Sequence, residues 1–80
     1  RIYERQEDQR EALGFYLRAA ATNPQREDLA RAIMGLYERL GQPADALATY
    51  ERLEAELQAT LGVAPDRQTI ELVKRIRAKL

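Results

Sequence analysis

The side chains that could do chemistry in this chain are carboxylates, guanidinium groups and four tyrosines. The sequence contains no histidine, cysteine or tryptophan, and no serine occurs along it. Nucleophilic catalysis usually needs serine or cysteine beside a histidine base, and zinc sites need cysteine or histidine ligands. No two carboxylates share an apolar setting that would separate their pKa values for acid–base work. We therefore expect no enzymatic activity, no cofactor and no metal site in this chain.

The charge balance argues against nucleic acid as a direct partner. Thirteen basic residues balance thirteen acidic ones, so the formal net charge is zero. A domain that binds duplex DNA normally carries a net basic footprint, and we expect salt-bridged helix surfaces instead. No apolar run approaches the ~20 residues that a membrane-spanning helix needs, so we expect no membrane contact. The absence of cysteine is compatible with a reducing cytoplasm, which is the location we predict.

One local cluster of positive charge stands out near the C-terminus. It consists of Lys74, Arg75, Arg77 and Lys79. Such a cluster could contact phosphate or an acidic partner. Cations in the last turn of a helix also complement the partial negative charge at that end, and this is the interpretation we favour.

The elements that must position these groups are helices. Strong helix formers dominate the composition, and no stretch alternates apolar and polar residues as a strand would. Breaks are indicated at Asn23-Pro24, at Gly41 to Pro43 and at Gly62 to Asp66. Asn23 is suited to cap the helix that follows it, with Pro24 at the first helical position, and Asp66 is suited to cap the last helix. The predicted helices cover residues 1–6, 9–22, 24–40, 43–61 and 67–79. Each is amphipathic, and the short connections predict antiparallel hairpins.

Comparison of the chain with itself reveals an internal repeat. Identical residues 34 positions apart include Tyr3 and Tyr37, Ala12 and Ala46, Leu13 and Leu47, and Tyr16 and Tyr50. The string Tyr3-Glu4-Arg5 also recurs as Tyr37-Glu38-Arg39. Helix–turn–helix units of 34 residues are typical of tetratricopeptide (TPR) repeats, although any pair of Ala/Leu/Tyr-rich helices would share part of this pattern. Both units depart from the TPR pattern. The second unit has Ala30 where tryptophan is frequent, and the first unit has Glu7 at the position of the turn glycine, Gly41, of the second.

The predicted fold is therefore all-α, with antiparallel helical hairpins stacked as a TPR-like right-handed array that ends in a C-terminal capping helix. We expect one domain. Residues 1–24 would end one repeat, residues 25–61 would form the second, and residues 62–80 would form a loop and the capping helix. Because the chain begins with arginine, we expect it to be a piece of a longer protein.

Two segments carry a resemblance to a known family. Residues 24–37 and the continuation from Gly41 to Arg52 resemble the bacterial transcriptional activator domain. The resemblance is sharpest at residues 61–66, Leu-Gly-Val-Ala-Pro-Asp, which look like the loop that closes the family's last TPR-like hairpin. The resemblance implies a winged-helix DNA-binding domain that lies N-terminal to this chain. It also implies self-association as a homo-oligomer, and contact with other domains of the same regulator or with the transcription machinery.

Two other functions stay open from the sequence. The chain could be a generic TPR scaffold with no connection to transcription, or an accessory domain attached to an enzyme. What precedes Arg1 would distinguish the first of these from a regulator, because a scaffold would continue with further 34-residue hairpins.

Stacked TPR hairpins line a concave face with their first helices, and this face is where we predict a protein partner. Arg31 and Arg39 could hold acidic groups there by two-point hydrogen bonding. Alternatively, Glu27 and Arg31 form an ordinary pair one helical turn apart. The candidate partner-binding residues are Glu4, Arg5, Asp28, Arg31, Gly35, Glu38 and Arg39.

Self-association is the second expectation about partners. The chain begins within a repeat, so the faces around Tyr3, Ala12 and Tyr16 have no upstream neighbour in the sequence given. An uncovered apolar face invites pairing. We therefore predict either a dimer or fraying of the first helix.

Overall fold

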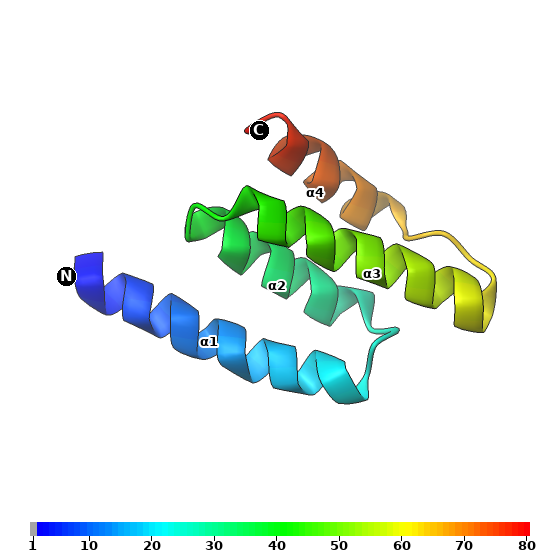
Figure 1. Ribbon diagram of the computed structural model, residues 1–80, viewed down its shortest axis with the longest axis horizontal. Coiled ribbons are helices and arrows are strands. Elements are labelled where there is room, and N and C mark those ends of the chain that lie inside the picture. The colour runs from blue at the N-terminus through cyan, green and yellow to red at the C-terminus, as the bar shows by residue number, and fades with distance from the viewer. Residues whose placement is uncertain (1) are drawn as a thin grey trace.

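The computed structural model describes the backbone of residues 2–80 and the side chains of residues 6–80. It contains α1 (Ile2–Thr22), α2 (Glu27–Arg39), α3 (Pro43–Leu61) and α4 (Arg67–Arg77). No strand occurs between residues 2 and 80, which confirms the all-α class over that range. Figure 1 shows α1, α2 and α3 side by side with successive helices antiparallel, and α4 contacts both α2 and α3.

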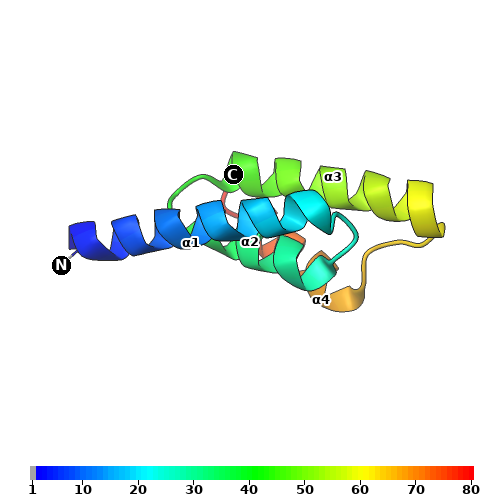
Figure 2. The same ribbon diagram turned by 90° about the horizontal axis from the view of Figure 1, so that it is seen from below.

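The predicted break between residues 6 and 9 is wrong, because α1 continues through it as one helix of 21 residues. Neither glycine nor proline occurs there, and Glu7 is a good helix former. The 34-residue match of Tyr3 with Tyr37 therefore does not extend to the fold. Tyr37 lies in the last turn of α2 and Ala46 in the first turn of the antiparallel α3, whereas Tyr3 and Ala12 lie on the same helix. The N-terminal part of α1 extends beyond α2 (Figure 2).

The break at Asn23 is confirmed, but its chemistry differs from the prediction. Asparagine was expected to cap the next helix with Pro24 in its first turn, yet α2 begins only at Glu27. The Asn23 side chain instead donates a hydrogen bond of 3.0 Å to the carbonyl oxygen of Ala19. Asn23 thus closes α1 and leaves a short turn before α2.

The two glycine breaks follow the prediction. Gly41 (φ 75°) and Gly62 (φ 66°) both adopt the left-handed conformation, in which residues with a side chain are strained. Asp66 caps α4, since its carboxylate accepts a hydrogen bond of 3.1 Å from the backbone N–H of Thr69. α4 then ends at Arg77, two residues before the predicted end.

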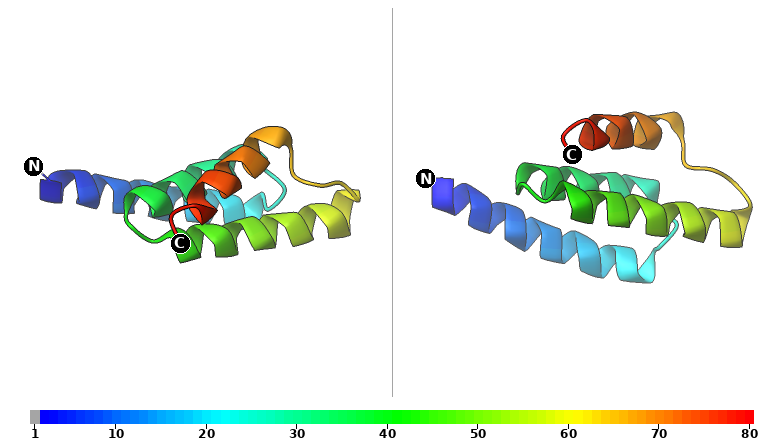
Figure 3. Two further views of the ribbon diagram at one scale, coloured as in Figure 1. Left: turned by 90° about the horizontal axis from the view of Figure 1, so that it is seen from above. Right: turned by 45° about the horizontal axis from the view of Figure 1, so that its top comes forward.

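The apolar core is concentrated around α3. One cluster joins α2, α3 and α4 through Met34, Ala46, Tyr50, Val73 and Ile76. A second joins α2 to α3 through Ala30, Leu53 and Leu57. The third joins α1 to α2 through Leu13, Ile33 and Leu36. Among the described residues, α1 contacts α2 and reaches neither α3 nor α4 (Figure 3).

Candidate functional site

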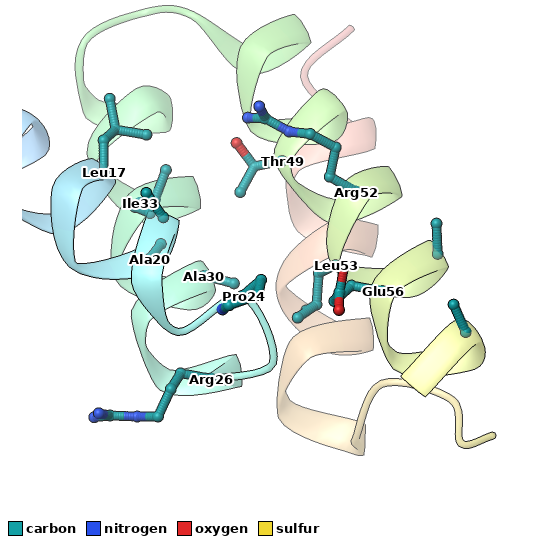
Figure 4. A pocket seen from close by; sticks show the side chains of 13 residues that line it. Leu17, Ala20, Pro24, Arg26, Ala30, Ile33, Thr49, Arg52, Leu53 and Glu56 are labelled. Atoms are coloured by element: carbon teal, nitrogen blue, oxygen red, sulfur yellow. The ribbon is translucent and has the colours of Figure 1, made fainter. Parts of the chain in front are cut away.

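An open groove separates the C-terminal half of α1 from α3, and α2 forms its floor (Figure 4). Its volume is about 560 Å³. We call it the α1–α3 groove. It is lined by Leu17, Ala20, Ala21, Pro24, Arg26, Ala30, Ile33, Thr49, Arg52, Leu53, Ala55, Glu56 and Ala59.

The groove exists because its walls carry small side chains. Ala20 and Ala21 face it from α1, and Ala55 and Ala59 face it from α3, one turn apart. Helices normally pack with axes 8–10 Å apart, but no Cα atom of α1 described here lies within 8 Å of α3. Ile33, which is 2% exposed, closes the floor from α2. The result is an apolar channel wide enough for side chains larger than alanine.

Charged residues lie along the groove without internal partners. Arg52 and Glu56 are one turn apart on α3, and neither forms an ion pair with another side chain among residues 6–80. Arg26 differs, because its guanidinium donates two hydrogen bonds of 2.9 and 2.6 Å to the Asp28 carboxylate. These bonds lower the pKa of Asp28 to about 2. Arg52 and Glu56 are therefore the charges in the groove that are free to meet a partner.

Arg31, which was predicted to lie on the concave face, contacts the start of α4. Its guanidinium donates a hydrogen bond of 3.0 Å to the Thr69 hydroxyl and lies 3.3 Å from the Asp66 carboxylate. The predicted Glu27–Arg31 pair is present at 4.0 Å, but Glu27 also accepts from the Thr69 hydroxyl at 2.8 Å and from the Asp66 backbone N–H at 2.9 Å. The hydrogen bond from the Thr69 backbone N–H is the main cause that lowers the pKa of Asp66, and the positive charge of Arg31 lowers it further. This polar cluster joins the start of α4 to α2.

Glu38 makes the corresponding contact at the other end of α4. Its side chain is only 8% exposed, and its carboxylate lies 2.7 Å from the Arg75 guanidinium and 2.8 Å from the Lys79 ammonium. The Arg75 hydrogen bond, followed by that of Lys79, lowers the pKa of Glu38. Arg77 lies 5.9 Å from the centre of the Tyr50 ring. Three of the four residues in the basic cluster thus contact neighbouring helices, a role that the dipole argument did not identify.

The other predicted partner residues differ in accessibility. Asp28 and Arg39 are exposed. Gly35 is half-buried, and a side chain there would meet only the tip of Arg39 at 3.8 Å. The side chains of Glu4 and Arg5 lie outside the described residues. Partner binding by these seven residues stays a prediction, and the geometry assigns Arg31 and Glu38 a structural contact with α4.

The α1–α3 groove was not predicted from the sequence. The signal that indicates it is the run of alanines at the end of α1 together with Ala55 and Ala59 on α3, which leaves facing helix surfaces unfilled. The exposure of Phe15 on α1, whose side chain is 62% exposed, was not predicted either. Neither feature depends on a residue type usually associated with function, so a search for chemical motifs passes over both.

The described residues contain neither an acidic cluster suited to a metal ion nor a helix suited to cross a membrane. No three Asp or Glu side chains gather there in a manner that would hold a metal ion. No helix in the same part of the chain combines the length and apolar character needed to cross a membrane.

Comparison with known proteins identifies the family. The sequence model of the bacterial transcriptional activator domain matches residues 3–77. No curated protein and no solved structure gives a significant match. The family match spans nearly the whole chain, which includes the loop at residues 61–66 and the helix after it. It confirms the resemblance that those segments indicated, and the chain therefore belongs to the bacterial transcriptional activator domain family.

Proposed function

We propose that this chain is a protein–protein interaction and oligomerisation domain of a bacterial transcriptional regulator. Family membership supports the regulatory role. Target DNA would be bound by a separate winged-helix domain N-terminal to this chain, and the regulator would act in the cytoplasm. Its partners would be copies of itself, other domains of the same regulator or the transcription machinery.

The zero net charge of the chain supports leaving DNA contact to another domain. Two cations of the basic cluster, Arg75 and Lys79, are paired with Glu38. The antiparallel order of α1, α2 and α3 supports the finer fold assignment of a TPR-like right-handed stack. In that arrangement α4 is the capping helix, because it packs on both α2 and α3.

The α1–α3 groove is the observation that carries the interaction role. Its lining on α3 runs from Thr49 to Ala59, which corresponds to about 15 Å or three helical turns. Grooves of this shape bind the apolar face of an amphipathic helix. Alanine-lined walls favour bulky anchor residues on that helix. We propose a partner helix with an acidic residue opposite Arg52 and a basic residue one turn away, opposite Glu56.

An exposed alanine in the groove provides the test. The variant Ala55→Glu places a charge in the apolar channel, and Ala48→Glu makes the same change at an exposed position of α3 that does not line it. In the full-length regulator, Ala55→Glu should abolish activation of a promoter–reporter fusion while promoter binding in gel shifts is retained. Ala48→Glu should preserve both. Equal activation by the two variants would reject the groove as the partner site.

Arg39 is the strongest of the predicted concave-face residues for a second partner contact. It is exposed, and the space over Gly35 beside it is open. We propose that it binds a carboxylate of the partner. Arg39→Glu should then weaken activation less than Ala55→Glu does, because a charge at the rim of an interface contributes less than a filled apolar channel.

A further inference from the structure

α1 and α3 carry equivalent apolar stripes, but only that of α3 is covered. At the 34-residue offset, Ala46, Thr49, Tyr50 and Leu53 of α3 correspond to Ala12, Phe15, Tyr16 and Ala19 of α1. All four residues on α3 are at most 9% exposed. On α1, Phe15 is 62% exposed and the other three residues are half-buried. We call these four residues of α1 the outer stripe.

The outer stripe is a continuous apolar surface. Its members are spaced i, i+3, i+4 and i+7, which places them on one face of the helix. Ala12 and Tyr16 also touch the cluster beneath α2, so α2 covers one edge of the stripe. The Phe15 and Tyr16 rings meet edge to face with centroids 5.7 Å apart, which holds Phe15 against the helix surface. No described helix other than α2 contacts α1.

We infer that a second copy of this chain covers the outer stripe, with the two α1 helices antiparallel. The pattern Ala-x-x-Phe-Tyr-x-x-Ala has alanine at both ends and two aromatic residues at its centre, so the order of small and aromatic residues is the same in both directions along the helix. A two-fold axis between Phe15 and Tyr16 therefore places Ala12 opposite Ala19 of the partner subunit, and aromatic rings opposite aromatic rings. Small residues at both ends allow close approach of the backbones. Self-complementarity of this kind is what a two-fold interface requires.

The charges beside the stripe favour the same arrangement. Asp8 and Glu11 precede Phe15 on α1, and Arg18 follows it. Antiparallel pairing brings Glu11 near Arg18 of the partner subunit on both sides of the axis. Antiparallel helix dipoles also attract each other. This inference rests on the proposed oligomerisation function and specifies the surface and the partner.

Analytical ultracentrifugation of the 80-residue chain tests the inference. We expect a monomer–dimer equilibrium with a dissociation constant in the micromolar range, since one helix pair makes a small interface. Phe15→Glu should raise that constant at least about tenfold. Leu61→Glu is the matched control, because Leu61 is 59% exposed but lies at the end of α3. It should leave the constant unchanged. Circular dichroism establishes that each variant is folded.

A charge exchange tests the antiparallel orientation. Glu11→Arg and Arg18→Glu should each weaken the dimer severalfold by placing like charges across the interface. The double variant restores both pairs and should recover most of the affinity. A wild-type chain that stays monomeric at millimolar concentration would overturn the inference. So would a Phe15→Glu dimer of unchanged affinity, or a double variant that is weaker than either single one.

The experiments distinguish a failure of the dimer through the outer stripe from a failure of the α1–α3 groove as a partner site. Ala55→Glu should leave the dissociation constant of the dimer unchanged, because the groove lies on the other side of α1 from the outer stripe. If the dimer is absent but Ala55→Glu still abolishes activation, the groove remains the partner site and the two-fold dimer is rejected.

Discussion

Helices α1 and α3 share a residue pattern but not an environment. α3 contacts both α2 and α4, and its apolar residues Leu53 and Leu57 are at most 4% exposed. Within the part of the chain that the structure describes, α1 contacts α2 alone and leaves Phe15 in solvent. A helix that packs between neighbours buries its apolar stripe, whereas a helix with a neighbour on one side leaves part of that stripe exposed. The contrast separates the part of the chain that stabilises the fold from the part that is open to a partner.

Polar contacts differ between the two regions in the same way. α4 is joined to α2 at its start by Arg31, Asp66 and Thr69, and at its end by Glu38. No ion pair connects α1 to another helix among the residues whose side chains are described. We therefore expect the stability of the monomer to depend mainly on α2, α3 and α4.

The largest contrast is expected between Ile76→Ala and Phe15→Ala. Ile76 is fully buried beneath α3, and its truncation should lower the free energy of unfolding by about 2–4 kcal/mol. Phe15 is exposed, so its truncation should change the value by less than about 0.5 kcal/mol in dilute solution, where the chain is monomeric. Urea denaturation followed by circular dichroism gives both numbers. Similar losses of unfolding free energy in the two variants would contradict the proposed difference between α4 and α1.

Glu38→Gln should have the next largest effect. It removes the charge that binds Arg75 and Lys79, and we expect a loss of about 1–2 kcal/mol in the free energy of unfolding. Glu51→Gln is the control, because Glu51 is exposed on α3 and has no ion-pair partner among the described side chains. It should cost nearly nothing. A loss from Glu51→Gln as large as that from Glu38→Gln would argue against the contact between α2 and α4.

The pH dependence of stability follows from the same contacts. The pKa values of Glu38 and Asp66 are lower in the folded chain than their ordinary values. Their stabilisation is fully present above the ordinary carboxyl range of about 4 and is lost as pH falls through the lowered folded values. Urea midpoints should therefore drop steadily below about pH 4, and less steeply in Glu38→Gln. Identical pH profiles for the two proteins would show that Glu38 is not responsible.

The smallest effects should come from two glycines on the two helices. Gly62 ends α3 with φ at 66°, so Gly62→Ala should destabilise by about 1 kcal/mol. Gly14 lies inside α1, and a side chain there would meet only the tip of Arg18 at an ordinary contact distance of 3.5 Å. Gly14→Ala should therefore stabilise by roughly 0.5–1 kcal/mol. Thermal melts of the two variants should shift in opposite directions, and shifts of the same sign would contradict the assignment.

Much of the fold could be predicted from local chemistry. Gly41, Gly62 and Asp66 act through their own backbone conformations or a neighbouring N–H, so their positions in the sequence were sufficient. The continuity of α1 was missed because the match of Tyr3 with Tyr37 suggested a break that no residue enforces. Asn23 was misassigned because an asparagine side chain can close one helix as readily as it opens the next.

The candidate site could be predicted less well, because it depends on how the helices pack. Arg31 and Glu38 were placed on the correct helix, but α4 docks against them, and no pattern within α2 indicates that contact. The α1–α3 groove likewise arises from the distance between two helices that are not adjacent in sequence. The outer stripe was partly anticipated, since Ala12 and Tyr16 were expected to lack a neighbour. Phe15 was not recognised as part of it.

Hydrogen exchange at two protein concentrations tests the contrast between α1 and α3 most directly. At low concentration we expect the amides of α1 to exchange faster than those of α3, because α1 has one neighbouring helix and α3 has two. At high concentration the amides around Phe15 should become more protected, while those of α3 from Ala46 to Leu57 should not change. Protection of α1 that equals that of α3 and is independent of concentration would contradict the account.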